Sequence, residues 1–122
     1  PIEHIVTLRS TPNLNNWRPA DLVETAVAWK NAVCSKITPT CLIFSRQGTS
    51  AIGRTSEQIS AIEMGGYLLK EKKDNDITIV ASGSEVQLAL DAAKELENKS
   101  INANVVSMPS LDIFLQQSKQ LY

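Results

Sequence analysis

The sequence predicts an α/β protein built from βαβ units with parallel strands, contributed by two adjacent domains. Residues 40–44 and 77–81 are short runs of apolar and β-branched residues, which favour buried strands. Apolar residues within 21–33 and 86–96 recur at helical spacing. A strand, a helix and a second strand follow one another within about 30 residues up to Pro109, which is the length of one right-handed βαβ unit.

The N-terminal part is expected to form a strand–helix–strand unit. Residues 2–8 fit either the end of a helix or an extended piece, and residues 14–18 fit a short strand. Pro19 presets the helical φ angle for a helix over residues 21–33. The strand over residues 40–44 then completes this unit.

Residues 48–60 are predicted to cross between two units, because this stretch is poor in apolar residues and rich in glycine, serine and threonine. A short helical turn fits residues 57–64, and Gly65-Gly66 ends it. The second unit begins with a strand over residues 67–69. Residues 70–76 are charged and fit either a hairpin or a solvated surface loop before the strand over 77–81.

Three pairs of residues have the spacing of a capping box, in which a cap residue and a residue three positions later exchange hydrogen bonds with the backbone. They are Asp21 with Glu24, Ser82 with Glu85, and Ser84 with Gln87. The last two pairs lie in a tight turn from strand to helix, where Gly83 meets the need for a small residue. That helix closes over residues 98–102, and the strand over residues 104–108 follows it.

Composition excludes several classes of protein. The chain has 122 residues, of which 43% are hydrophobic and 20% charged, with a net charge of −1. Charges of both signs are mixed, so no basic stripe indicates nucleic acid, and the longest apolar run is too short to cross a membrane. Cys34 and Cys41 lack metal-binding spacing and a companion histidine, so we expect two free thiols, with a disulfide as the alternative.

The two ends of the chain favour a piece of a larger protein. The chain begins at Pro1 without an initiator methionine, and a new apolar segment over residues 111–115 begins shortly before Tyr122. We therefore expect part of the functional machinery to lie outside this sequence.

Arg46 is the first candidate for contact with a substrate. The apolar run Leu42-Ile43-Phe44 ends abruptly in Ser45-Arg46-Gln47. In α/β proteins, ligands gather just past the carboxyl ends of parallel strands. A guanidinium there offers a fixed charge and a planar fork of donors suited to a phosphate or a carboxylate. The alternative is an arginine paired with a surface carboxylate.

The other chemistry-bearing residues give weaker signals. His4 has no nucleophile that can be paired with it from the sequence, so we interpret it as a surface or packing residue. Ser82-Gly83-Ser84 opens a helix and could hold an anion, but it is neither a dinucleotide-binding motif nor a P-loop, so a structural turn is the better interpretation. Asp112 suits either a ligand-prone strand end or the N-cap of a helix that starts after Leu111. The remaining candidates are assigned to packing or left as single carboxylates, namely Trp29 and Cys41 in the core, and Glu3 and Glu24 without an obvious partner.

Seven short motifs run in order along nearly the whole chain. They are Pro1-Ile2-Glu3-His4, Arg9-Ser10-Thr11-Pro12-Asn13, Trp17-Arg18-Pro19-Ala20-Asp21, Leu42-Ile43-Phe44-Ser45-Arg46-Gln47, Gly65-Gly66-Tyr67-Leu68-Leu69, Ala81-Ser82-Gly83-Ser84-Glu85-Val86 and Val105-Val106-Ser107-Met108-Pro109. Together they resemble the transketolase family, and in particular its bacterial and yeast branch. The resemblance implies that residues 1–47 end the pyrimidine-binding domain, residues 48–64 cross between domains, and residues 65–122 start the transketolase C-terminal domain.

The resemblance also implies a function for the intact protein. Transketolases are cytosolic homodimers that use thiamine diphosphate and a divalent cation, Mg²⁺ or Ca²⁺. They transfer a two-carbon ketol unit from a ketose phosphate to an aldose phosphate, in the pentose phosphate pathway and the Calvin cycle. No nucleic acid and no membrane are among the partners that the resemblance implies.

Within the family, the arginine of the Ser-Arg-Gln motif binds the sugar phosphate, and this role falls on Arg46. The catalytic, cofactor-binding and metal-binding residues lie upstream of the Pro-Ile-Glu stretch in family members, so the resemblance assigns none of them here. We expect this chain alone neither to bind thiamine diphosphate tightly nor to turn over substrate. Gly48-Thr49 departs from the asparagine and apolar residue usual after Ser-Arg-Gln, which leaves the conformation of that loop open, and Ser82 replaces a frequent threonine.

Two alternatives stay open at this point. One is another thiamine-diphosphate enzyme with the same domain order, such as deoxyxylulose-phosphate synthase or a 2-oxo-acid dehydrogenase β subunit. Those relatives share the βαβ layout but do not usually carry the Trp-Arg-Pro-Ala-Asp run. The other alternative is a non-catalytic α/β interaction module.

Overall fold

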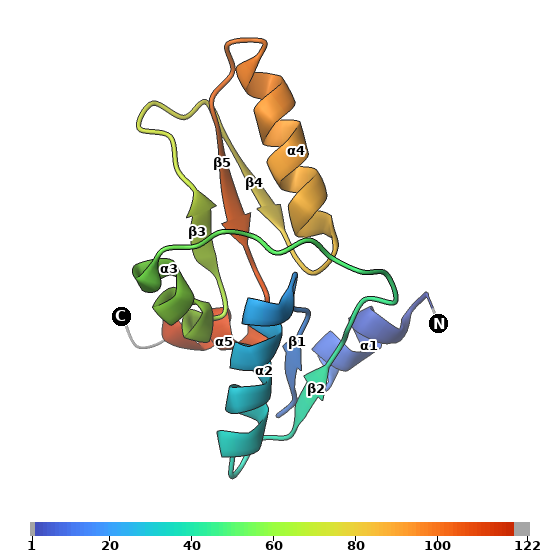
Figure 1. Cartoon of the computed structure of the whole chain (residues 1–122). Helices are drawn as coiled ribbons and strands as arrows, with labels where there is room; N and C mark the ends of the chain where they lie inside the picture. The colour runs from blue at the N-terminus through green and yellow to red at the C-terminus, as the bar shows by residue number, and fades with distance from the viewer. Residues whose placement is uncertain (1, 119–122) are drawn as a thin grey trace.

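A computed structural model describes residues 2–118 and shows two small sheets joined by a long crossing segment (Figure 1). The first unit consists of α1 (His4–Ser10), β1 (Asn15–Trp17), α2 (Leu22–Cys34) and β2 (Thr40–Leu42). β1 and β2 pair in parallel, with Trp17 opposite Leu42. The strand–helix–strand unit predicted from the sequence is confirmed, and the first residues, which the sequence left open, are helical.

The crossing segment ends in α3 (Ser56–Ala61) and the 3₁₀ turn η1 (Ile62–Met64), where a helical turn was predicted. The second unit then consists of β3 (Tyr67–Lys70), β4 (Ile77–Ala81), α4 (Glu85–Glu97), β5 (Ala103–Ser107) and α5 (Leu111–Ser118). Its strand order is β3-β5-β4, and β4 and β5 run parallel with α4 between them in the chain. The predicted unit of strand, helix and strand is therefore present, with its two strands adjacent and parallel.

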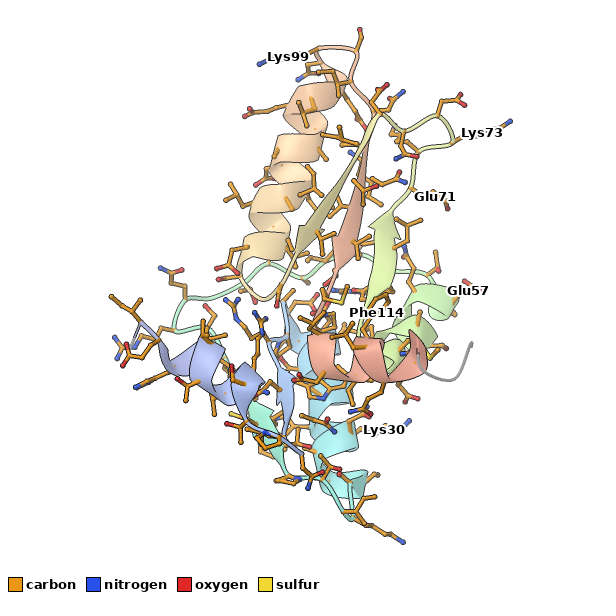
Figure 2. The ribbon with its side chains drawn as sticks, turned by 180° about the vertical axis from the view of Figure 1, so that it is seen from behind. Lys30, Glu57, Glu71, Lys73, Lys99 and Phe114 are labelled. Atoms are coloured by element: carbon orange, nitrogen blue, oxygen red, sulfur yellow. The ribbon has the colours of Figure 1, made fainter. Side chains whose placement is uncertain are left out.

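β3 pairs with β5 in the antiparallel direction, so the second sheet is mixed. The hairpin interpretation of residues 70–76 is wrong, because β5 lies between β3 and β4 and the chain must pass across the end of the sheet. The alternative interpretation, a solvated loop, is confirmed: Glu71 and Lys73 are exposed, and Figure 2 shows them at the outer end of the sheet.

The main hydrophobic cluster joins the two units. Trp17, Ala20 and Ala28 come from the first unit, and they pack in one cluster with Tyr67 and Val86 of the second. Burial of apolar side chains contributes roughly 25 cal/mol per Å² removed from water. The two units therefore share the apolar contacts that stabilise them.

Two predicted caps are wrong and one is half right. Asp21 Oδ1 accepts a hydrogen bond from Glu24 N at 3.2 Å, as an N-cap should, but the Glu24 side chain turns away to accept from Ala20 N at 2.7 Å. α4 begins at Glu85 without a side-chain cap, because Ser84 already has helical backbone angles. The glycine requirement is confirmed, since Gly83 has φ +62° and a Cβ there would lie 3.3 Å from the Arg18 guanidinium.

Three predicted side-chain environments also differ from the structure. Trp29 is 52% exposed and stacks on Phe44, with ring centroids 6.3 Å apart, because it lies on the outer face of α2. Cys41 is only half-buried. Asp112 is not an N-cap, because α5 already begins at Leu111; its Oδ2 accepts instead from the Asn16 amide at 2.8 Å.

Candidate functional site

The carboxyl ends of β1 and β2 lie side by side, because the two strands are parallel and in register. Ile43 N donates to Trp17 O at 2.8 Å, which continues the pairing one step beyond the assigned strands. Arg18 directly follows β1, and Ser45 stands three residues beyond the end of β2. This edge is where α/β sheets usually bind ligands.

A cleft of about 200 Å³ lies at this edge. Ile43, Phe44 and Ser45 line one side, and Arg18, Gly83 and Ser84 line the other. The Arg18 guanidinium is held by Glu85, with Nη2 3.0 Å from Oε2. The cleft therefore lies between the strand ends of the first unit and the start of α4.

Arg46 lies in the exposed loop that continues from this cleft. Within residues 2–118 it forms no hydrogen bond or ion pair, so no carboxylate of the described chain neutralises it. The sequence interpretation of Arg46 as one half of a surface ion pair is therefore not what the structure shows. Arg46 is not among the residues that line the cleft and stands four residues beyond the end of β2. An unneutralised guanidinium in such a loop can bind an anion through two parallel hydrogen bonds.

A buried cluster of charged and hydroxyl side chains lies behind this edge. Arg54 of the crossing segment forms ion pairs with Asp21 (Nη1 to Oδ2, 2.6 Å) and Glu24 (Nη2 to Oε1, 3.3 Å). All three side chains are at most 1% exposed. Isolated buried charges are very unfavourable, so this arrangement requires each charge to be paired.

Hydroxyl groups of the second unit complete the cluster. Tyr67 of β3 donates to Glu24 Oε1 at 2.7 Å and accepts from Arg54 Nε at 2.6 Å. Ser107 of β5 donates to the same Glu24 oxygen at 2.6 Å. We call Asp21, Glu24, Arg54, Tyr67 and Ser107 the buried polar cluster; it connects α2, the crossing segment and the second sheet.

The surroundings shift the ionisation of the cluster in consistent directions. Burial disfavours the charged form of Asp21, but the Arg54 guanidinium and the amides of Ile52 and Glu24 outweigh it and hold the pKa of Asp21 below its usual value. Burial and the charge of Glu24 raise the pKa of Tyr67, so its hydroxyl keeps the proton that it donates. Burial opposes the charge of Arg54, yet its bonds to Asp21 and Tyr67 raise its pKa.

The residues that the structure describes do not fit a site for thiamine diphosphate and its metal ion. Among residues 2–118, no group of three or more histidine, cysteine, aspartate or glutamate side chains could hold a metal ion. The two buried carboxylates, Asp21 and Glu24, are already occupied by Arg54 and by neighbouring hydroxyl groups.

His4 lies where the sequence placed it, on the surface, with Nε2 4.0 Å from Glu3 Oε1. The turn at Ser82-Gly83-Ser84 lies beside the cleft but approaches it through Gly83 and Ser84 only. The partners of Glu24 could not be predicted from the sequence, because Arg54 stands in a segment that is otherwise polar and poor in apolar residues. Both cysteines are free, as expected.

Comparison with known proteins identifies the family to which this chain is similar. Residues 65–122 match the family model described as the transketolase-like TK C-terminal domain. Transketolase 2 of Vibrio parahaemolyticus is 49% identical over 118 residues, which is 96% of this chain. The chain belongs to the transketolase family. The transketolase of Buchnera aphidicola is 50% identical over the same length, and this chain spans 18% of the length of each of these relatives.

Solved transketolase structures agree with the fold. The transketolase of Pichia stipitis, in a complex with sedoheptulose 7-phosphate, has a TM-score of 0.91 at 45% identity over 98% of this chain and 18% of its own. A split-gene transketolase, described as an inactive β4 tetramer, has a TM-score of 0.75 at 35% identity, over 90% of this chain and 35% of its own. The mixed α/β fold with parallel strands predicted from the sequence is thereby confirmed. None of the helices among residues 2–118 has the length and apolarity that crossing a membrane requires.

Proposed function

We propose that this chain is the part of a transketolase in which Arg46 binds the phosphate of the sugar substrate. The complete enzyme would transfer a two-carbon ketol unit from a ketose phosphate to an aldose phosphate. The observation that carries the proposal is the exposed, unneutralised guanidinium in the loop that follows β2, one of two paired parallel strands. Relatives crystallised with sedoheptulose 7-phosphate and xylulose 5-phosphate support phosphorylated sugars as the substrate class.

Arginine suits this task for chemical reasons. A phosphate dianion presents several acceptor oxygens, and a planar fork of donors fixes both its distance and its direction. Binding energy from the phosphate, which does not itself react, can orient the reacting carbonyl. The proposed contribution of this chain is thus to bind and orient the substrate.

The remaining features of the enzyme are proposed to come from outside this chain. They include the residues that hold thiamine diphosphate and Mg²⁺ or Ca²⁺, and the second subunit of a cytoplasmic homodimer. We further propose that residues 1–47 end the pyrimidine-binding domain, residues 48–64 cross between domains, and residues 65–122 start the C-terminal domain. The pathway context proposed for this activity is the pentose phosphate pathway or the Calvin cycle.

The role of Arg46 is tested in a complete enzyme. We define the chimera as the Vibrio parahaemolyticus relative in which this chain replaces the matching segment. In the chimera, Arg46→Ala should raise the KM for fructose 6-phosphate about ten- to a hundredfold, as expected for the loss of a hydrogen-bonded charge. The kcat/KM for fructose, which lacks the phosphate, should stay as in the parent chimera.

Arg9→Ala is the matched control, because Arg9 is also exposed but lies on α1. Arg9→Ala should change neither the KM for fructose 6-phosphate nor the kcat/KM for fructose. An equal loss with fructose 6-phosphate and fructose would show that Arg46 is structural. A parent chimera without ketol transfer would contradict the proposed function as a whole.

The isolated chain supplies a second prediction. Because its residues do not fit a cofactor and metal site, the 122-residue chain should show no ketol transfer with thiamine diphosphate, Mg²⁺, a ketose phosphate and an aldose phosphate. Calorimetric titration with thiamine diphosphate and Mg²⁺ should show no tight binding. Turnover by the chain alone would contradict the proposal that the catalytic residues lie elsewhere.

A further inference from the structure

The loop that carries Arg46 is fixed to the protein at both of its ends. The loop comprises residues 44–51, all of which are exposed. At its upstream end, Ile43 N donates to Trp17 O at 2.8 Å. At its downstream end, Ile52 N donates to Asp21 Oδ2 at 3.0 Å. The first acceptor is the last residue of β1 and the second is the N-cap of α2, so they lie at the two ends of the short connection between these elements.

The downstream attachment is the stronger of the two, since it is charge-assisted and shielded from water. Asp21 Oδ2 accepts from both Ile52 N and Arg54 Nη1, while Asp21 Oδ1 accepts from Glu24 N. Arg54 Nη1 also donates to Ile52 O at 2.9 Å, so Ile52 is held through its amide and its carbonyl. Hydrogen bonds to ionised groups are about twice as strong as neutral ones, and low solvent exposure strengthens them further.

Apart from the stacking of Phe44 on Trp29 at its first residue, the loop contributes little to its own shape. Gln47 N donates to Ser45 Oγ at 3.1 Å, and this bond spans only two residues. Gly48 has open space around the position of a Cβ. A segment with few buried contacts and an exposed backbone samples many conformations unless its ends restrict it. The ends of this loop therefore determine where Arg46 can lie.

We propose that Asp21 is a positioning residue for phosphate binding, one that holds the Arg46 loop in place through Ile52 and Arg54 without touching the substrate. This inference rests on the proposed function of Arg46. Apparent affinity falls in proportion to the fraction of molecules in the binding-competent conformation. Releasing the downstream end would lower that fraction and leave the chemistry of the guanidinium unchanged.

The test uses Asp21→Asn in the chimera. An asparagine presents one acceptor oxygen to Ile52 N or to Glu24 N, and it carries no charge for Arg54. If the loop is then competent about a tenth of the time, the KM for fructose 6-phosphate should rise about tenfold, because apparent affinity scales with the competent fraction. The kcat with fructose 6-phosphate and the kcat/KM for fructose should stay close to the parent values.

A direct readout of the loop accompanies the kinetics. Trypsin cleaves after arginine, and cleavage of a native protein reports local opening. In Asp21→Asn, cleavage after Arg46 should be about tenfold faster than in the parent. The cleavage rate follows the fraction of molecules in which the downstream end of the loop is released. Ser107→Ala is the matched control, because it removes a hydrogen bond to Glu24 from the same buried polar cluster but touches neither Asp21 nor the loop. It should change neither the KM nor cleavage after Arg46.

The outcomes separate the two proposals. If Arg46→Ala raises the KM selectively but Asp21→Asn does not, the positioning role is wrong and the proposed function stands. If Asp21→Asn lowers the kcat/KM for fructose 6-phosphate and for fructose by the same factor, Asp21 is merely structural and the inference fails. If Arg46→Ala has no selective effect, the proposed function itself fails.

A second variant tests the same constraint if Asp21→Asn does not fold. Insertion of two glycines after Ser50 lengthens the exposed loop and leaves the buried polar cluster intact. It should also raise the KM for fructose 6-phosphate selectively. An unchanged KM would show that the loop needs no fixed downstream end, and it would overturn the inference.

Discussion

Glu24 is fully buried, yet its carboxylate is well satisfied. Its two oxygens accept from Ala20 N, Tyr67 Oη, Ser107 Oγ and Arg54 Nη2. The spacing in the sequence predicted a capping box, which would have placed this side chain at the surface of a helix start. The partners come from up to 83 residues away in the chain, so local spacing carries no information about them.

At the same scale, Asp21 links stability to pH. Its folded-state pKa lies below the ordinary value of 3.8, so its contribution is present above that value and is lost as the pH falls through the folded pKa. Urea unfolding of the chain at a series of pH values should show stability decreasing below about pH 4, where carboxylates of the unfolded chain become protonated. Asp21→Asn should remove part of this decrease; an identical pH dependence in the variant would contradict the assignment.

The elements show which parts of the fold the sequence could predict. The α2 and α4 helices follow from hydrophobic periodicity, and the β4 and β5 strands follow from runs of apolar and β-branched residues, because these residues belong to the two hydrophobic clusters. The antiparallel direction of β3 did not follow, since a short apolar run does not specify its neighbour. The exposure of Trp29 did not follow either, because the pattern that marks a buried face is the same whether or not another element covers it.

The candidate site, like the fold, could be predicted from the sequence only in part. The position of Arg46 beyond a strand end could be predicted from one abrupt change of polarity. Its phosphate-binding role came from the family resemblance and stays a prediction. The buried polar cluster could not be predicted, because its members lie on different elements and each has an ordinary surface interpretation when taken alone.

Alanine substitutions at two glycines test whether the turn before α4 requires a glycine. Gly83→Ala should destabilise the chain by roughly 1–2 kcal/mol, because an alanine at φ +62° is strained and its Cβ meets the Arg18 guanidinium. Gly53→Ala should stay within about 0.5 kcal/mol of the parent, since nothing lies within 4 Å of its Cβ position. Urea unfolding measures both, and equal effects would contradict the conformational argument.

At the scale of the whole molecule, the shared core and the buried polar cluster make the two units interdependent. Native-state hydrogen exchange should therefore give the same opening free energy for the slowest amides of α2 and of β5.

Arg54→Ala should lower the free energy of unfolding by about 3–5 kcal/mol, because it leaves two carboxylates buried without their cation. It should also make the two units exchange at different rates; equal exchange after this substitution would contradict the interdependence.

The placement of Arg54 on the second-unit side of the exposed loop has a consequence for breaks in the backbone. A nick anywhere between Gln47 and Ala51 would leave every ion pair of Arg54 inside the molecule. The two pieces would then be held by contacts that need no covalent bond between them, as in a protein assembled from two separately made halves. A backbone break next to the proposed phosphate-binding arginine would thus leave intact the buried ion pairs of Arg54 with α2 and its N-cap.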